Sequence, residues 1–207
     1  VVTGAETYSI AVGEVWNFFE QELQYPVSMI TVQSLGNLDL SETNVLVMPD
    51  GNYPKNIHEK LSSWVSRGGK PFDIKQKEAA KELAVARQYS EKDKDDFNNA
   101  IPGAIYKVSL DKTHPLTLGL SRYYSLITED KIYQPLAEGW NVGQLKTGAY
   151  VTGIAGKNVQ KKLGDGLLFG VQPIGNGNVV YLGANVLFRL FWESGKQIFL
   201  NGVFIVQ

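Results

Sequence analysis

The stretch Asn44-Val45-Leu46-Val47-Met48 is a short apolar run that ends in Pro49-Asp50-Gly51. Continuous apolar runs of this length are typical of strands that are buried on both faces of a parallel sheet. Pro54 suits the first turn of a following helix, and Gly68-Gly69 mark the end of that helix. Because strand and helix alternate along this region, the sequence predicts βαβ units and a parallel sheet.

Further elements are predicted on both sides of this region. The apolar residues between Val12 and Leu23 follow the i, i+3, i+4, i+7 spacing of an amphipathic helix, and residues 26–32 (PVSMITV) are predicted as a strand. Gly175-x-Gly177 precedes a strand instead of opening a helix, so it predicts a hairpin turn and not a phosphate-binding loop. The second half is predicted to hold strands at Ala104–Leu110, Tyr123–Ile127, Trp140–Leu145, Ala149–Ile154, Leu167–Gln172 and Val179–Gly183, and a last helix from Phe188 to Gly202.

The alternation breaks after Gly69-Lys70, where another buried strand is expected. The sequence gives Pro71-Phe72-Asp73 and then a charged stretch, with six Lys or Arg and seven Asp or Glu from Asp73 to Asp96. We predict a charged, partly mobile insertion at about 71–98 that contains a solvated helix from Ile74 to Tyr89. Either a strand has been lost here, or residues are missing from the sequence between Lys70 and Pro71.

Composition bounds the function of the chain. The 207 residues, 43% of them hydrophobic, suffice for one domain with a real core, and we expect 1–207 to be a single α/β domain. The net charge of -1 does not indicate a surface that binds nucleic acid. No apolar run reaches the length of a membrane span. The start at Val1, without methionine, predicts a fragment of a longer protein.

Chemistry-bearing residues are scarce. The chain has no cysteine and two histidines, His58 and His114, so it offers no thiolate nucleophile and no histidine-rich metal site. His114 precedes Pro115, where a turn histidine is the plainer interpretation and a base or ligand role is the alternative. No GxSxG motif occurs. We therefore predict no catalytic residue, no metal site and no cofactor.

The loop after the strand predicted at residues 44–48 is a candidate ligand site. Ligands of open α/β sheets bind beyond the carboxyl ends of the strands. Asp50, Gly51, Asn52 and Tyr53 follow one buried strand, and Asn185 follows the predicted strand at Val179–Gly183. The alternative is that Pro49-Asp50-Gly51-Asn52 is turn chemistry and a helix cap. With His114, these residues are the predicted ligand-binding set.

Three stretches together resemble a known family. They are Gly13–Leu23 with Tyr25-Pro26-Val27, Asn44–Gly51 with Trp64–Lys70, and Ile101–Ala104 with Thr113–Leu116 and Val179–Gly183. They are similar to the class I glutamine amidotransferase-like domain, in the version found C-terminal to the catalytic domain of exported bacterial zinc carboxypeptidases. The resemblance spans nearly the whole chain.

The resemblance implies a flavodoxin-like three-layer α/β/α sandwich with a mainly parallel sheet and extra antiparallel strands in the C-terminal half. True amidotransferases place a nucleophilic cysteine on a sharp turn after a central strand, which here falls just past Lys70, with a His and a Glu later. This sequence has no cysteine, and no His-x-Glu occurs near Asn185. No catalytic residue of the family carries over, and neither do the zinc ligands of the carboxypeptidase domain.

We therefore expect a non-catalytic accessory domain. It would bind a small molecule, peptide or glycan, or support a neighbouring zinc carboxypeptidase domain in the same exported, periplasmic or extracellular protein. One alternative is a hydrolase with an unrecognised Asp/His/Ser set, for which Asp50 and His114 are the first suspects. A purely structural domain, whose strand-end cleft is filled by its own side chains, is the other.

Overall fold

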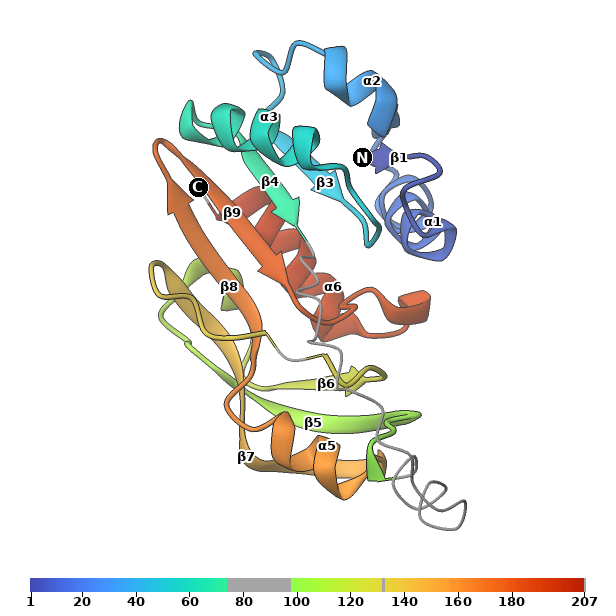
Figure 1. Cartoon of the computed structure of the whole chain (residues 1–207), viewed down its shortest axis with the longest axis vertical. Coiled ribbons are helices and arrows are strands. Elements are labelled where there is room, and N and C mark those ends of the chain that lie inside the picture. The colour runs from blue at the N-terminus through green and yellow to red at the C-terminus, as the bar shows by residue number, and fades with distance from the viewer. Residues whose placement is uncertain (74–97, 132, 207) are drawn as a thin grey trace, which may run out of the picture.

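The computed structural model describes residues 1–73, 98–131 and 133–206, with only the backbone given for 70–73. Its main sheet has seven strands in the order β3-β4-β9-β8-β7-β5-β6, and a second, two-stranded sheet pairs β1 with β2 (Figure 1). The strands are β1 Val2–Thr3, β2 Ile30–Thr31, β3 Val45–Met48, β4 Lys70–Asp73, β5 Gly103–Leu110, β6 Tyr123–Ile127, β7 Trp140–Ile154, β8 Leu167–Ile174 and β9 Gly177–Leu182.

Helices cover both faces of the end of the main sheet where β3, β4 and β9 run parallel. Side chains alternate along β3, so Leu46 and Met48 pack with α3 on one face and Val47 joins the core that contains α1 and α6 on the other. The described helices are α1 Ser9–Asn17, η1 Phe18–Glu22, α2 Val32–Asn37, α3 Lys55–Ser66, η2 Pro115–Thr117, α5 Lys157–Lys162, η3 Phe188–Leu190, α6 Glu193–Leu200 and η4 Asn201–Ile205.

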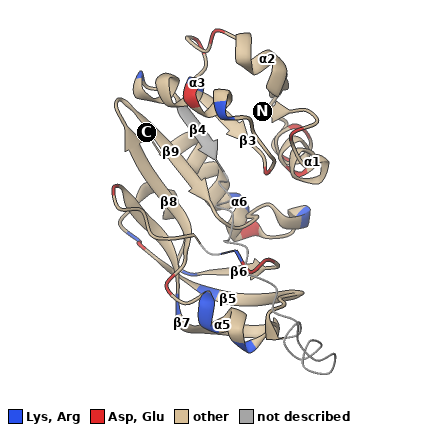
Figure 2. Cartoon of the chain, in the orientation of Figure 1, with Lys and Arg blue, Asp and Glu red and all other residues tan. Residues whose placement is uncertain are grey.

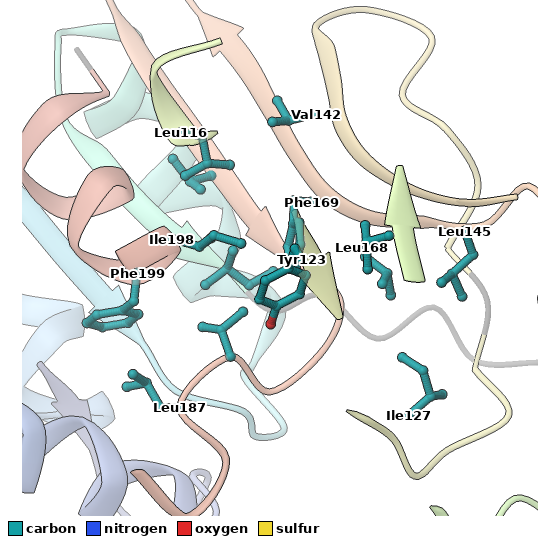
Figure 3. Close-up of a cluster of buried hydrophobic side chains, with 14 of the residues drawn as sticks. Leu116, Tyr123, Ile127, Val142, Leu145, Leu168, Phe169, Leu187, Ile198 and Phe199 are labelled. Atoms are coloured by element: carbon teal, nitrogen blue, oxygen red, sulfur yellow. The ribbon is translucent and has the colours of Figure 1, made fainter. Parts of the chain in front are cut away.

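The other strands of the main sheet are antiparallel and curl away from this layered part (Figure 1). β8 pairs antiparallel with β9 through a two-residue turn, Gly175-Asn176, in which Gly175 has φ +60°. The register between β7 and β5 shifts twice, and β-bulges of this kind bend a sheet. Tyr123, Phe169, Val142 and Leu145 fill the inside of the curl (Figure 3).

The prediction of a mainly parallel flavodoxin-like sandwich is therefore wrong. Within the main sheet, β3-β4 and β4-β9 are the parallel pairs, and the five strands from β9 to β6 form a curled antiparallel half-barrel. The physical reason is the connections, because hairpin turns such as Gly175-Asn176 can join only antiparallel neighbours, whereas parallel strands need crossovers. The antiparallel strands that were expected as additions make up the larger part of this sheet.

The region after Gly69 also differs from the prediction. Lys70–Asp73 forms β4, which pairs with β3 on one side and β9 on the other, so the strand that seemed lost is present. Beyond it, most of the insertion predicted at 71–98 and the whole helix predicted from Ile74 lie outside the described residues. The hairpin at Gly175-x-Gly177 is confirmed, whereas the strand expected at 26–32 is reduced to Ile30–Thr31.

Candidate functional site

A cavity of about 380 Å³ lies where the carboxyl ends of β3 and β9 meet α1. Pro49 and Asp50 line it after β3, and Gly183, Ala184 and Asn185 line it after β9. Its floor is apolar and includes Leu145, Leu168, Leu187 and Phe199 from the core drawn in Figure 3. The remaining polar lining comes from Tyr8, Glu14, Thr128, Glu129, Lys131 and Tyr133.

The loop after β3 reaches this cavity through Asp50. The backbone carbonyl of Asp50 accepts a hydrogen bond from the Tyr8 amide at 2.9 Å, which joins this loop to the residue before α1. Of the six residues predicted as the ligand-binding set, Asp50 and Asn185 line this cavity. Parallel strands place their carboxyl ends at the same edge of a sheet, which is why the two loops meet.

Gly51, Asn52 and Tyr53 hold the loop in place and are not among the residues that line the cavity. A Cβ on Gly51 would lie 2.3 Å from the Glu6 carbonyl oxygen, and the Asn52 amide donates to that oxygen at 2.7 Å. The Tyr53 hydroxyl donates to the Pro49 carbonyl oxygen at 2.6 Å. These contacts fix the backbone that presents Asp50.

Asn185 is held by the carboxylate of Glu14, which was not among the site residues predicted from the sequence. Its Nδ2 donates to Glu14 Oε2 at 2.7 Å, and its Oδ1 accepts from the Leu187 amide at 3.0 Å. The other oxygen of Glu14 accepts from the amide of Arg189, which has a left-handed φ of 49°. Glu14 therefore ties α1 to the loop after β9 and holds that loop in an unfavourable backbone conformation. The spacing of the apolar residues on α1 indicates its buried face but not this link.

His114 lies away from this cavity. It lines a separate pocket of about 250 Å³ together with Asp111, Trp140 and Asn178, and Asp50 is not among the lining residues. Its Nδ1 accepts from the Leu116 amide at 3.1 Å, so its side chain caps the short helix η2, as the turn interpretation expects. Burial holds the pKa of His114 below its usual 6.5, against a smaller opposing effect of the Asp111 carboxylate.

This histidine makes stability depend on pH. Because its pKa is lower in the folded than in the unfolded chain, the unfolded chain takes up the proton first as pH falls. We expect the contribution of His114 to be complete above about pH 6.5 and to be lost below it. Urea midpoints should therefore fall more for the native chain than for His114→Asn between about pH 7.5 and pH 5. Parallel falls in the two proteins would contradict the assignment.

The second histidine, possible metal ligands, membrane spans and surface charge were also considered from the sequence. His58 lies on α3, outside both pockets, so the two histidines do not share a site. No group of three or more His, Cys, Asp or Glu among the described residues could hold a metal ion. None of the described helices is long and apolar enough to cross a membrane. Figure 2 shows Lys, Arg, Asp and Glu dispersed over the described elements, with lysines on α5.

Comparisons with known proteins identify the fold but not a family. No family model matches the chain, and no curated protein matches it. Among solved structures, a thua-like protein from Bacteroides uniformis has a TM-score of 0.57 at 15% identity, with 97% of this chain and 86% of that one covered. A thua-like protein from Parabacteroides merdae has a TM-score of 0.56 at 11% identity, with 98% and 86% covered.

A third similar structure is much longer than this chain. It is the exo-beta-1,4-mannosidase Op5Man5 from Opitutaceae bacterium strain TAV5, with a TM-score of 0.54 at 10% identity. The match covers 96% of this chain but 31% of the mannosidase. The thua-like neighbours have the class I glutamine amidotransferase-like fold, which supports that part of the sequence resemblance. None of the comparisons links the chain to carboxypeptidases.

Proposed function

We propose that this chain is a non-catalytic, amidotransferase-like module that binds a small ligand in the cavity at the ends of β3 and β9. The observation that carries the proposal is the convergence of Asp50, Asn185 and Glu14, from three separate elements, on one largely apolar cavity of about 380 Å³. Pockets of this size with apolar walls and a few polar groups are typical of small-molecule sites. Neither histidine lines it, and the chain has no cysteine, so a nucleophile–base pair of the amidotransferase kind is absent from the described lining.

The charge of the lining indicates which ligands the cavity rejects. Glu14, Asp50 and Glu129 supply three carboxylates against the one ammonium of Lys131, which leaves a formal charge of −2. Lys131 is also held by Glu129, with Nζ 2.7 Å from Oε2. An anionic ligand would face repulsion in a partly desolvated site. We therefore propose a neutral or cationic ligand, such as an amidated peptide or an uncharged glycan unit.

The accessory role is the finer part of the proposal. The sequence resemblance supports a place beside a zinc carboxypeptidase catalytic domain in an exported protein. The mannosidase supports the more general statement that this fold can form part of a longer hydrolase, because the match covers less than a third of that enzyme. Finding the complete reading frame around Val1 tests this part, and a frame that encodes no hydrolase domain would contradict it.

Ligand binding is tested by filling the cavity. Ala11 lies on α1 and lines the cavity, so Ala11→Phe adds a ring there without removing any of the hydrogen bonds described above. The native chain is screened by thermal shift against dipeptide amides, their free acids and neutral disaccharides. We expect at least one amide or disaccharide to bind, its free-acid counterpart to bind less, and Ala11→Phe to weaken binding about tenfold or more.

Gly13→Ala is the matched control for this experiment. Gly13 lies on the same helix, outside the cavity, and a Cβ there meets nothing within 4 Å. Binding should therefore be unchanged in Gly13→Ala. Binding that survives Ala11→Phe at full strength would remove the cavity as the site, and no binding by any probe would favour the purely structural domain.

A further inference from the structure

A second pocket lies at the opposite end of β8 and β9 from the cavity. Leu168 and Gly183 face the cavity, whereas Val171 and Asn178, further toward the β8–β9 turn, line the pocket of about 250 Å³. The remaining lining comes from the stretch after β5, from Trp140 at the start of β7 and from Val206 after η4. We propose that this pocket binds one polyhydroxylated six-membered ring, such as a pyranose unit of a glycan.

The polar groups of this pocket are held in fixed positions. Asp111 Oδ1 accepts from both the amide and the hydroxyl of Thr113, at 3.0 and 2.7 Å. The Thr117 hydroxyl bonds to the carbonyl oxygens of Asp111 and His114, at 2.7 and 2.9 Å. The loop therefore presents its side chains without a large cost for ordering them on binding.

His114 supplies an unused donor in this pocket. The side chain is only 9% exposed, and Nδ1 is occupied as the acceptor for the Leu116 amide. The proton of the neutral ring is therefore on Nε2, the opposite side of the imidazole. No hydrogen bond from Nε2 to another described residue is found, and the atom is not among the buried polar atoms without a partner, so it can donate to water or to a ligand in the pocket.

Trp140 places an exposed indole ring beside His114. Its ring centroid lies 5.5 Å from that of His114, and 48% of the residue is exposed although it begins β7. Its backbone is fixed, because Trp140 pairs with Val171 and the preceding Gly139, at φ +117°, has no room for a Cβ, which would lie 2.4 Å from the Val171 carbonyl oxygen. The sheet thus positions the backbone that carries the exposed indole.

These groups match hydroxyls on an apolar ring frame. A hydroxyl both donates and accepts, so neighbouring hydroxyls can accept from His114 Nε2 and Asn178 and donate to the Asp111 carboxylate. The C–H face of such a ring can lie on the negative face of the indole. A purely apolar ligand would leave the imidazole donor unsatisfied, and a phosphate would meet a carboxylate with no Lys or Arg among the described lining residues.

The test follows the four indole N–H signals of the full chain by ¹H–¹⁵N NMR. Methyl α-mannopyranoside and methyl β-glucopyranoside are titrated to millimolar concentrations, with myo-inositol as a free cyclitol and cyclohexanol as a ring with a single hydroxyl. We expect a saturable shift of the Trp140 signal with a pyranoside and none with cyclohexanol. A response to inositol alone would assign the same chemistry to a free polyol.

Variants separate this site from the cavity. Trp140→Ala should weaken pyranoside binding, read from ligand-observed saturation transfer, about tenfold or more. Trp16→Ala, a control at a similarly exposed tryptophan outside both pockets, should leave it unchanged, and so should Ala11→Phe. No saturable shift of Trp140 with any hydroxylated ring, or an equal shift with cyclohexanol, overturns the proposal, whatever binds in the cavity.

Discussion

Replacing Phe169 with alanine is expected to lower the free energy of unfolding by about 3 to 5 kcal/mol. Phe169 lies near the start of β8, is fully buried, and packs edge-on against Tyr123 at 5.2 Å between ring centroids (Figure 3). On the neighbouring strand it sits opposite Gly143, where a Cβ would lie only 2.2 Å from its ring. The ring therefore fills space that no other side chain can enter, and its removal leaves a cavity.

Urea unfolding of the native chain and of Phe169→Ala measures this loss. Phe191→Ala is the matched control, because Phe191 is 56% exposed and its loss should cost about 1 kcal/mol or less. The contrast between the two substitutions tests whether the centre of the curled half-barrel is a true core. Equal losses at the two positions would refute the packing described for β7 and β8.

The same strand shows why its direction could not be predicted from the sequence. Leu167 to Val171 form a continuous apolar run, and all five residues are buried. Such a run indicates burial on both faces, which a parallel sheet between helices and a tightly curled antiparallel sheet both provide. The sequence therefore predicted the position of β8 but not its pairing, and the parallel order of the first 70 residues was extended too far.

The residues of the candidate site were likewise only partly predictable from the sequence. Asp50 and Asn185 could be placed together because each follows a strand that belongs to the parallel part of the sheet, and that rule needs only the strand positions. Glu14 could not be found this way, since its partners Asn185 and Arg189 are more than 170 positions away in the chain. His114 was grouped with Asp50 by residue type alone, and the structure places the two in different pockets.

Gly195→Ala is expected to destabilise the chain by about 1 to 3 kcal/mol, the usual cost of overpacking. Gly195 lies in the first turn of α6, where a Cβ would lie 2.0 Å from the Val186 carbonyl oxygen. Because that atom is backbone, it cannot move aside as a side chain would. The first turn of α6 or the loop that carries Val186 must shift instead.

This shift should also change the cavity, because Val186 lines it between Asn185 and Leu187. We therefore expect Gly195→Ala both to lower the urea midpoint and to weaken any ligand that Ala11→Phe excludes. Gly13→Ala is the control for the general preference of helices for alanine. It replaces a glycine of α1 at a position where a Cβ meets nothing within 4 Å, so it should stabilise the chain by about 0.5 to 1 kcal/mol. If Gly195→Ala and Gly13→Ala both stabilise the chain, α6 does not pack against the loop that carries Val186 as closely as described. The described geometry of the cavity, which depends on that contact, would then also be contradicted.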